Sequence, residues 1–228
     1  MMKHIITADG SSSLYHEALN ETYHSKHGAM AESKYVFIQN GLEEVFKSKD
    51  EVKLLEVGFG TGLNAFLSIE IALKFPQKKI YYCGLEPYPI PVSFLQQGNE
   101  HSLNYTQNYE EKLQKMFFQI HDCEWNKEVW ITHNFQFLKL KTKLEDVCLQ
   151  TDFYDLVYFD AFAPNKQPEM WSKSQFEKLY LSLKTGGFLV TYCAQGEFKR
   201  TLKSVGFEVK ALQGPKGKRE MTMGIKRS

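Results

Sequence analysis

The chain has 228 residues, a formal net charge of +1, and hydrophobic and charged fractions of 43% and 24%. These values suit one large α/β domain with a small addition, and they exclude a strongly basic nucleic-acid binder without excluding a local basic patch. No apolar run is long enough to span a bilayer, and the first nine residues do not form a signal peptide. The four cysteines are scattered without a C-x-x-C pair, which predicts free thiols in a reducing cytoplasm.

Residues 1–50 are expected to form an extension that packs over the ligand-binding edge of the main domain, or simply a leading strand and helix. Apolar residues recur at helical spacing from Tyr35 to Phe46, which predicts a helix over residues 31–47. His16, His24 and His27 raise the question of a metal, but no carboxylate and histidine set with ligand spacing accompanies them. We therefore expect solvated or hydrogen-bonded histidines.

A strand, a tight turn and a helix are predicted around the stretch L-L-E-V-G-F-G-T-G-L-N, residues 54–64. Its glycines allow positive φ and a close approach of a ligand to the main chain. The helix that follows offers free N–H groups at the same place. The candidate ligand-binding residues of this stretch are Glu56, Gly58, Gly60, Thr61, Gly62 and Asn64.

The pattern of this turn discriminates between ligands. A dinucleotide fingerprint requires glycine where Leu63 stands, and a phosphate-binding loop requires a lysine after Gly62. The observed E-x-G-x-G-x-G resembles motif I of class I S-adenosylmethionine-dependent methyltransferases. An acid such as Glu56 beside the turn suits a ligand that carries a sulfonium and an ammonium group. The simpler alternative is a glycine-rich turn without a ligand.

A second strand is predicted over residues 79–85 and ends in Glu86. An acid at this place holds ribose hydroxyls in such folds, because a carboxylate can accept two hydrogen bonds from a vicinal diol. The rigid P-Y-P-I-P segment should then lead into a helix over residues 92–101, and another helix is predicted at 109–119.

The second half of the chain continues the alternation of strands and helices. It predicts a doubly wound, mostly parallel, seven-stranded α/β sheet over residues 51–228, with an antiparallel last strand. Ligands of such sheets bind beyond the carboxyl ends of the strands. The predicted strands are 130–140, 154–160, 188–193, 206–212 and 221–226; the helices are 142–149, 174–183 and 197–205; and a basic turn spans 214–219.

Three stretches carry a more specific resemblance: G-F-G-T-G-L-N (58–64), D-A-F-A-P-x-K-x-P-E-M-W (160–171) and G-K-R-E-M (217–221). Together they resemble the tRNA 5-methylaminomethyl-2-thiouridine methyltransferase family, which comprises the amino-terminal domain of MnmC and the stand-alone MnmD proteins. The resemblance implies a class I fold and methyl transfer from S-adenosylmethionine to the amine of 5-aminomethyl-2-thiouridine at the tRNA wobble position. It also implies methylation only, since no flavin-dependent domain is present in these residues.

The resemblance further assigns roles to individual residues. Asp160 is expected to orient the amine, accept its proton and contact the cofactor. Phe162 and Pro164 are expected to wall the substrate pocket. Thr142, or else a backbone carbonyl, is expected to replace the acid that family members carry after the third strand for adenine recognition. Expected phosphate contacts to the tRNA anticodon stem-loop are Lys216, Lys218 and Arg219, with Lys166 and Lys173 extending the patch.

Two other interpretations stay open. One is a class I methyltransferase acting on another small amine or RNA. The other is a non-catalytic S-adenosylmethionine-fold protein that binds RNA or a partner chain, although such a protein would not need Asp160 or the proline-containing loop after it. A nicotinamide dehydrogenase is disfavoured by Leu63. The sequence sets no oligomeric state, and a monomer is compatible with it.

Overall fold

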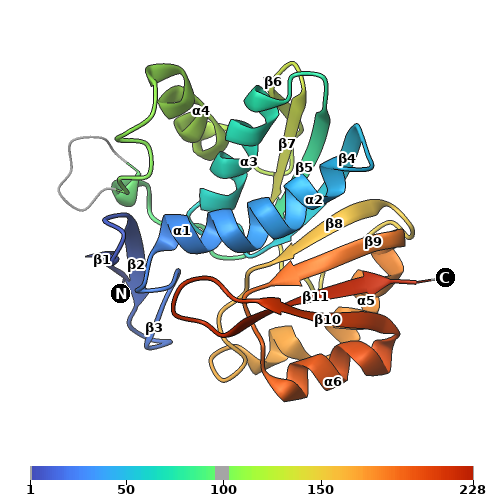
Figure 1. The fold of residues 1–228 in the computed structure, drawn as a ribbon. Helices are drawn as coiled ribbons and strands as arrows, with labels where there is room; N and C mark the ends of the chain where they lie inside the picture. Colours follow the sequence, from blue (N-terminus) through green and yellow to red (C-terminus); the bar gives the residue numbers. More distant parts are fainter. Residues whose placement is uncertain (1, 96–102, 228) are drawn as a thin grey trace.

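The computed structural model describes residues 2–95 and 103–227, whose centre is an eight-stranded sheet (Figure 1). Its strand order is β10-β11-β9-β8-β4-β5-β7-β6. Strand β4 is parallel to β5 and β8, whereas β11 is antiparallel to β9 and β10. The bounds are β4 Glu51–Val57, β5 Lys79–Leu85, β6 Val129–Thr132, β7 Phe135–Leu140, β8 Tyr154–Phe159, β9 Leu183–Thr191, β10 Phe207–Gln213 and β11 Glu220–Lys226.

The class I methyltransferase fold and its antiparallel last strand are confirmed, but the sheet has one strand more than predicted. The stretch predicted as one strand, 130–140, folds as the antiparallel pair β6 and β7. Asn134 sits at the bend, where its amide donates hydrogen bonds to the carbonyls of Ala72 and Lys78. These bonds hold the bend against the end of α3 (Leu63–Lys74), so the chain reverses there instead of continuing.

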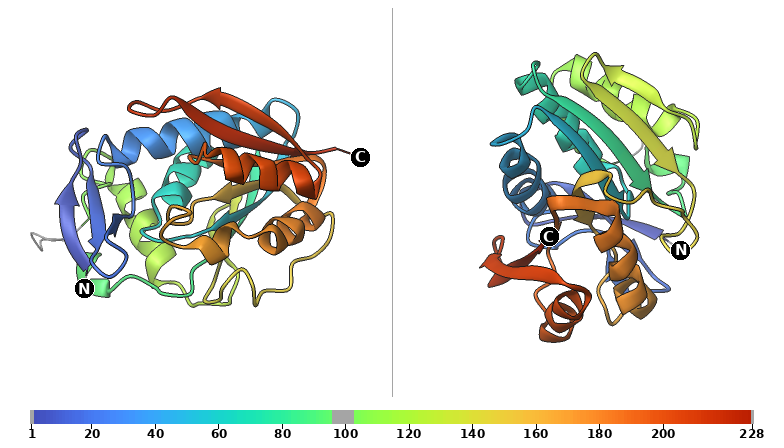
Figure 2. Two further views of the ribbon diagram at one scale, coloured as in Figure 1. Left: turned by 90° about the horizontal axis from the view of Figure 1, so that it is seen from below. Right: turned by 90° about the vertical axis from the view of Figure 1, so that its right-hand side faces the viewer.

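Helices cover both faces of the sheet (Figure 2). Side chains of β4 alternate between the two faces: Leu54 belongs to one buried cluster, and Leu55 and Val57 belong to the other. The first face carries α3 (Leu63–Lys74), α4 (Glu111–Asp122) and a long amino-terminal helix; the second carries η3 (Pro168–Trp171), α5 (Lys173–Ser182) and α6 (Gly196–Val205).

The long amino-terminal helix is continuous through α1 (Ala29–Ser33), the π-helical η1 (Lys34–Leu42) and α2 (Glu43–Phe46). It packs closely on the sheet at Gly41, where an added Cβ would lie 2.9 Å from the ring of Tyr158. Its apolar residues share one hydrophobic cluster with β4. Consequently the parts expected on either side of residue 50 share a core.

A small antiparallel sheet precedes this helix and consists of β1 (Met2–Ile6), β2 (Ser12–His16) and β3 (Glu21–Thr22). Its β1–β2 loop caps the helix. Thr7 Oγ1, Ser11 Oγ and Asp9 Oδ2 accept hydrogen bonds from successive backbone N–H groups of the first helical turn. These side chains satisfy donors that a helix leaves unpaired, which fixes the small sheet at the end of the helix.

Two predicted helices differ from the structure. The helix predicted at 142–149 is absent, because Lys178 Nζ donates to the carbonyls of Leu144, Glu145 and Val147 and holds this segment in an irregular path. Of the helix predicted at 92–101, the structure has the short η2 (Val92–Phe94), and residues 96–102 lie outside the described part of the chain.

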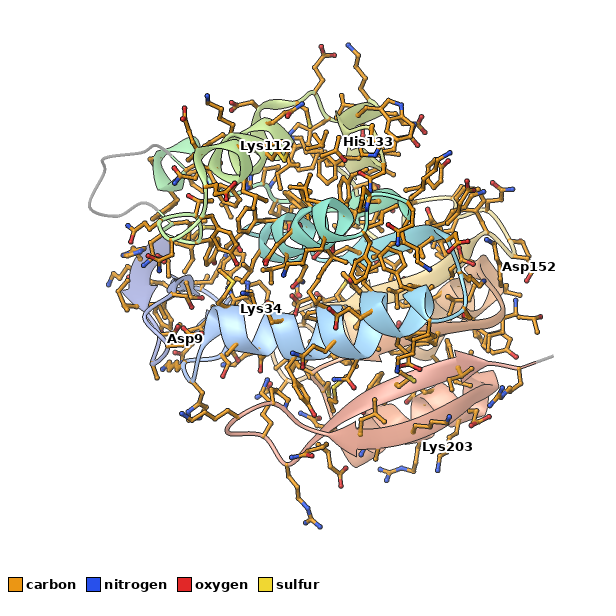
Figure 3. The ribbon with its side chains drawn as sticks, turned by 45° about the horizontal axis from the view of Figure 1, so that its top comes forward. Asp9, Lys34, Lys112, His133, Asp152 and Lys203 are labelled. Atoms are coloured by element: carbon orange, nitrogen blue, oxygen red, sulfur yellow. The ribbon has the colours of Figure 1, made fainter. Side chains whose placement is uncertain are left out.

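Figure 3 shows the side chains on the ribbon, and the buried ones are mostly apolar. Within residues 2–95 and 103–227, no helix is long and apolar enough to cross a bilayer. Of the residues labelled there, Asp9, Lys112, His133, Asp152 and Lys203 are all exposed.

Candidate active site

A cavity of about 780 Å³ opens beyond the carboxyl ends of β4, β5 and β8. Strand β4 lies between β5 and β8, so this edge is the topological switch point where doubly wound sheets bind ligands. The volume falls within the usual range for small-molecule sites. The wall combines residues of the glycine turn and the strand ends with residues of the amino-terminal extension, among them His16, Tyr23, His24 and Glu32.

The glycines of the turn have different reasons to be glycine. Gly58 has φ +92°, and a Cβ there would lie 2.5 Å from the carbonyl oxygen of Asp160. Gly58 therefore lets the ends of β4 and β8 approach each other, and it lines the cavity together with Gly60 and Thr61. Gly62 is not part of the wall: a Cβ there would lie 2.8 Å from Nε2 of His121, behind the turn.

Asn64 joins the two acids of the site. Its Nδ2 donates to Asp160 Oδ2 at 2.8 Å and to Glu56 Oε1 at 2.9 Å. Only the nitrogen end of the amide can serve two carboxyl acceptors, which fixes the orientation of the side chain. Asn64 Oδ1 is buried and has no hydrogen-bond partner among the described residues, and Asn64 lines the cavity. An acceptor at the cavity wall is thus available to a ligand.

The carboxyl group of Asp160 titrates near neutrality. Its pKa is raised to about 7, chiefly by burial and also by the nearby Glu32 carboxyl, although the hydrogen bond from Asn64 and the charge of Lys218 act in the opposite direction. Asp160 lies at the cavity wall directly after β8. A group with this pKa can accept a proton at neutral pH and release it again.

Glu56 lies one layer below the cavity. It is fully buried, is absent from the wall, and accepts a 2.6 Å hydrogen bond from the Tyr82 hydroxyl. Burial raises the pKa of Glu56 well above its ordinary value. The expectation of direct contact between this acid and a cationic ligand is therefore corrected: Glu56 reaches the cavity through Asn64, because the inward face of β4 points its side chain at α3.

Glu86 and Thr142 both line the cavity. Glu86 follows β5 and Thr142 lies after β7, so both are on the side of β4 opposite to β8 and Asp160. Glu86 Oε2 accepts from the N–H of Gly60 at 2.9 Å, and Oε1 accepts from the N–H of Tyr88 at 2.8 Å. Each oxygen keeps a further acceptor site, so a diol can still be bound. Burial raises the pKa of Glu86. The hydroxyl of Thr142 makes a long hydrogen bond, 3.4 Å, to the carbonyl of Lys143.

Of the expected pocket walls, Phe162 lines the cavity and Pro164 does not. The ring of Phe162 packs edge-on against Tyr23, with centroids 5.0 Å apart, so the extension contacts the loop after β8. The Phe162 carbonyl accepts a hydrogen bond from Trp171 Nε1. Trp171 is 7% exposed and belongs to the second buried cluster, where it anchors the loop.

The basic turn between β10 and β11 divides into two kinds of residue. Lys216 and Arg219 are exposed. Lys218 instead lines the cavity, with its Nζ 2.6 Å from Glu32 Oε2. Gly217, with φ +87°, packs so closely on His27 that a Cβ would lie 2.6 Å from the imidazole. This contact seats the turn against the amino-terminal extension, close to the start of α1 (Figure 1).

Sequence reasoning missed several residues of the wall. His24 is hydrogen-bonded to Ser13, and weakly to Thr61 and Tyr105, and burial lowers its pKa to about 4. No group of three or more His, Cys, Asp or Glu side chains within the described ranges is arranged to hold a metal ion. Glu32 and Tyr192 also line the cavity. Glu32 lies within the helix predicted over residues 31–47, and the spacing of apolar residues there gives no signal for its place in the cavity wall.

Comparison with known proteins gives a consistent result. The family model described as S-adenosyl-L-methionine-dependent methyltransferase matches residues 104–227. The bifunctional protein MnmC of tRNA 5-methylaminomethyl-2-thiouridine biosynthesis is 27% identical over 227 residues in Cupriavidus metallidurans, covering 96% of this chain. The same protein of Aliivibrio fischeri is 29% identical over 220 residues, covering 90% of the chain.

The chain spans about a third of the length of these relatives: 33% of the first and 32% of the second. Among solved structures, MnmC2 from Aquifex aeolicus aligns with 100% of this chain and 71% of its own, with a TM-score of 0.81 and 22% identity. That likeness shows the fold. Together with the family match, which spans more than half of the chain, it leads to one conclusion: the chain belongs to the S-adenosyl-L-methionine-dependent methyltransferases, with a methyltransferase domain of the MnmC type.

Proposed function

We propose that this methyltransferase converts 5-aminomethyl-2-thiouridine to 5-methylaminomethyl-2-thiouridine at the wobble position of tRNA. The observation that carries the proposal is Asp160, a half-buried carboxyl group with a pKa of about 7 in the wall of the cavity. An amine acceptor needs such a group because it is mostly protonated at neutral pH and has no lone pair in that form. Similarity to proteins named for the biosynthesis of this nucleoside supports the same acceptor.

The cavity residues fit S-adenosyl-L-methionine. Gly58 and Gly60 leave the main chain open to a ligand, and Asn64 Oδ1 is a buried acceptor without a partner among the described residues. We assign the ribose hydroxyls to Glu86 and the adenine side to Thr142. When bound, the cofactor supplies a methyl group that a neutral amine can accept.

The chain contributes proton acceptance and positioning. Asp160, in its ionised form, accepts a proton from the substrate ammonium and leaves a lone pair on the nitrogen. Asn64 holds the Asp160 carboxyl in place, and Glu56 with Tyr82 holds Asn64. Phe162 gives the acceptor an apolar wall. Holding the amine near its reaction partner in this way supplies a large part of the acceleration.

We place the tRNA phosphates over the exposed Lys216 and Arg219. Lys166 lines the cavity and Lys173 is exposed, so both can extend this surface. Lys218 is the exception among the basic residues, because Glu32 holds its ammonium in the cavity wall. Contacts of this kind contribute affinity that weakens as salt increases.

Nucleoside analysis tests the proposed substrate. The protein is incubated with methyl-labelled S-adenosyl-L-methionine and tRNA carrying 5-aminomethyl-2-thiouridine, and the tRNA is then digested. We expect label in 5-methylaminomethyl-2-thiouridine, and none when the tRNA carries an unmodified wobble uridine. Label in a different nucleoside, or in a small amine but not in tRNA, would reject this substrate while leaving the methyltransferase assignment intact.

A further inference from the structure

Lys218 occupies an unusual position for a lysine of a surface turn. Its ammonium lies 2.6 Å from Glu32 Oε2 and 4.1 Å from the centroid of the Tyr192 ring. Glu32, Tyr192 and Lys218 line the same cavity as Asp160. A carboxylate and an aromatic face that meet at one point form a receptor for an ammonium group.

Lys218 fills this receptor imperfectly. Glu32 is 9% exposed, and its Oε2 has no aligned hydrogen-bond donor in the part of the chain that the structure describes. The ion pair with Lys218 is therefore short in distance but poor in direction, and direction matters for hydrogen-bond strength. If the Lys218 ammonium moves away, this oxygen at the cavity wall is left to accept from a better-directed N–H donor.

The aromatic part of the receptor is fixed, whereas the lysine is not. The Tyr192 hydroxyl donates to the Ala161 carbonyl at 2.8 Å, which ties the ring to the loop after Asp160. The Lys218 side chain is 30% exposed and follows Gly217 in a turn whose neighbours Lys216 and Arg219 are in solvent. Lys218 can therefore leave the receptor for solvent without unfolding the cavity wall.

We propose that Glu32 and Tyr192 form an ammonium-binding subsite for the methyl acceptor, and that Lys218 fills it until the substrate ammonium displaces it. This inference rests on the proposed function in one respect, namely that the acceptor is an amine. The subsite selects the protonated amine from solution and delivers it beside Asp160. Asp160 then takes the proton, so the cation that was recognised becomes the neutral nucleophile.

If Lys218 competes with the substrate, removing Lys218 should strengthen the binding of an ammonium ligand. A lysine with only a structural role would not have this effect. Removing Lys218 with Lys218→Met leaves Glu32 without its resident cation, so an incoming ammonium should bind more tightly. Glu32→Gln removes the charge that attracts it, so binding should weaken. The matched control is Lys199→Met, which breaks the 2.5 Å ion pair between Lys199 on α6 and Glu220 on β11 without touching the cavity wall.

Calorimetry on protein loaded with S-adenosylhomocysteine measures this, with benzylamine as the cationic probe and benzyl alcohol as its neutral analogue. We expect Lys218→Met to bind benzylamine about tenfold tighter than the wild type and Glu32→Gln about tenfold weaker, a change of about 1.4 kcal/mol each way. Benzyl alcohol should bind all variants alike, and Lys199→Met should match the wild type. Unchanged or weaker benzylamine binding by Lys218→Met would overturn the proposal, as would undiminished binding by Glu32→Gln.

The tRNA assay separates this inference from the proposed function. If benzylamine binding changes in the variants as expected but no label enters tRNA, the tRNA substrate is rejected and the ammonium subsite is supported. Labelled 5-methylaminomethyl-2-thiouridine with no effect of Lys218→Met on benzylamine binding would keep the substrate and reject the subsite. Affinity for S-adenosylhomocysteine and the unfolding midpoint show that each variant is folded. If Lys218→Met fails that check, Lys218→Gln takes its place.

Discussion

Asn64 Nδ2 lies 2.8 Å from Asp160 Oδ2, so the first turn of α3 is bonded to the acid that follows β8. The same nitrogen serves Glu56 at 2.9 Å, which in turn is bonded to Tyr82. The Asp160 carboxyl group is thus connected through Asn64 on α3 to Glu56 on β4 and Tyr82 on β5. The position and protonation of Asp160 depend on this network.

Asn64→Leu should lower turnover by roughly a hundredfold, in line with the usual contribution of a positioned acid or base. The variant removes the hydrogen bond that lowers the pKa of Asp160, so the rise of activity with pH should move to higher pH. A pH–rate profile at saturating substrate measures both effects. Glu70→Gln, on the same helix but outside the cavity wall, is the control. An unshifted profile in Asn64→Leu would contradict the network.

Asp160→Asn should reduce turnover by about two to four orders of magnitude while S-adenosylhomocysteine still binds. In the wild type, activity should rise as pH increases through about 7, because the ionised carboxyl is the proton acceptor. Single-turnover rates across this range, with calorimetry for cofactor binding, provide the measurement. Undiminished turnover in Asp160→Asn would remove Asp160 from the catalytic role.

The same substitution should stabilise the protein in alkaline solution. The folded pKa of Asp160, about 7, exceeds the unfolded value of 3.8, so the folded state holds the extra proton between them and loses stability as pH rises through about 7. Asp160→Asn should therefore raise the free energy of unfolding at about pH 8 by roughly 2–4 kcal/mol, and by nothing at about pH 3.5. Urea unfolding at both pH values tests this, and equal gains at both would refute it.

His24 should make the protein sensitive to acid. Burial lowers its folded pKa to about 4 from 6.5, so the unfolded state binds more protons between these values and stability falls as pH drops from 6.5 to about 4. Between pH 6.5 and about 4, the free energy of unfolding of His24→Asn should fall by on the order of 3 kcal/mol less than that of the wild type. The remaining pH dependence includes His121, whose pKa burial lowers to about 3. The comparison requires unfolding curves of both proteins, and identical slopes would argue against His24 as a buried neutral group.

Gly58→Ala should be far more damaging than Gly186→Ala. Both glycines have positive φ, +92° and +80°, but a Cβ at Gly58 meets the Asp160 carbonyl at 2.5 Å, whereas nothing lies within 4 Å at Gly186. Gly186→Ala should lower the free energy of unfolding by about 1 kcal/mol through backbone strain, and Gly58→Ala should lower it by at least about 3 kcal/mol. Gly58→Ala should also weaken cofactor binding. Thermal unfolding and S-adenosylhomocysteine titration give the comparison. Equal losses would mean that the close approach of β4 and β8 is unimportant.

Lys216→Met and Arg219→Met should each weaken tRNA binding and reduce its salt dependence by about one phosphate contact. Lys203→Met, an exposed lysine on α6 (Figure 3), is the control. Binding is measured by titrating fluorescent tRNA at several salt concentrations. A salt slope that is the same in all three variants would place the tRNA elsewhere on the surface.

Much of this protein follows from local sequence. The apolar run ending in Gly58, Gly60 and Gly62 determines a strand, a turn and a helix, because few residues other than glycine adopt these backbone angles. The alternation of strands and helices determines a mostly parallel, doubly wound sheet. Asp160 follows an apolar strand, and the resemblance of the D-A-F-A-P stretch to the family motif makes it a candidate site residue. The antiparallel β11 follows from the short connection to β10.

Tertiary structure decided which of these residues reach the cavity. Glu56 and Gly62 belong to the same motif as Gly58, yet neither lines the cavity. Glu56 points to the α3 face of β4, and Gly62 packs against His121. The motif alone does not determine either contact. Lys218 belongs to the same basic turn as Lys216, yet it points inward because Gly217 packs on His27 and brings Glu32 within reach. A short motif determines which backbone shapes are allowed, but the direction of a side chain depends on partners that lie far away in the sequence, and only the folded chain brings those partners together.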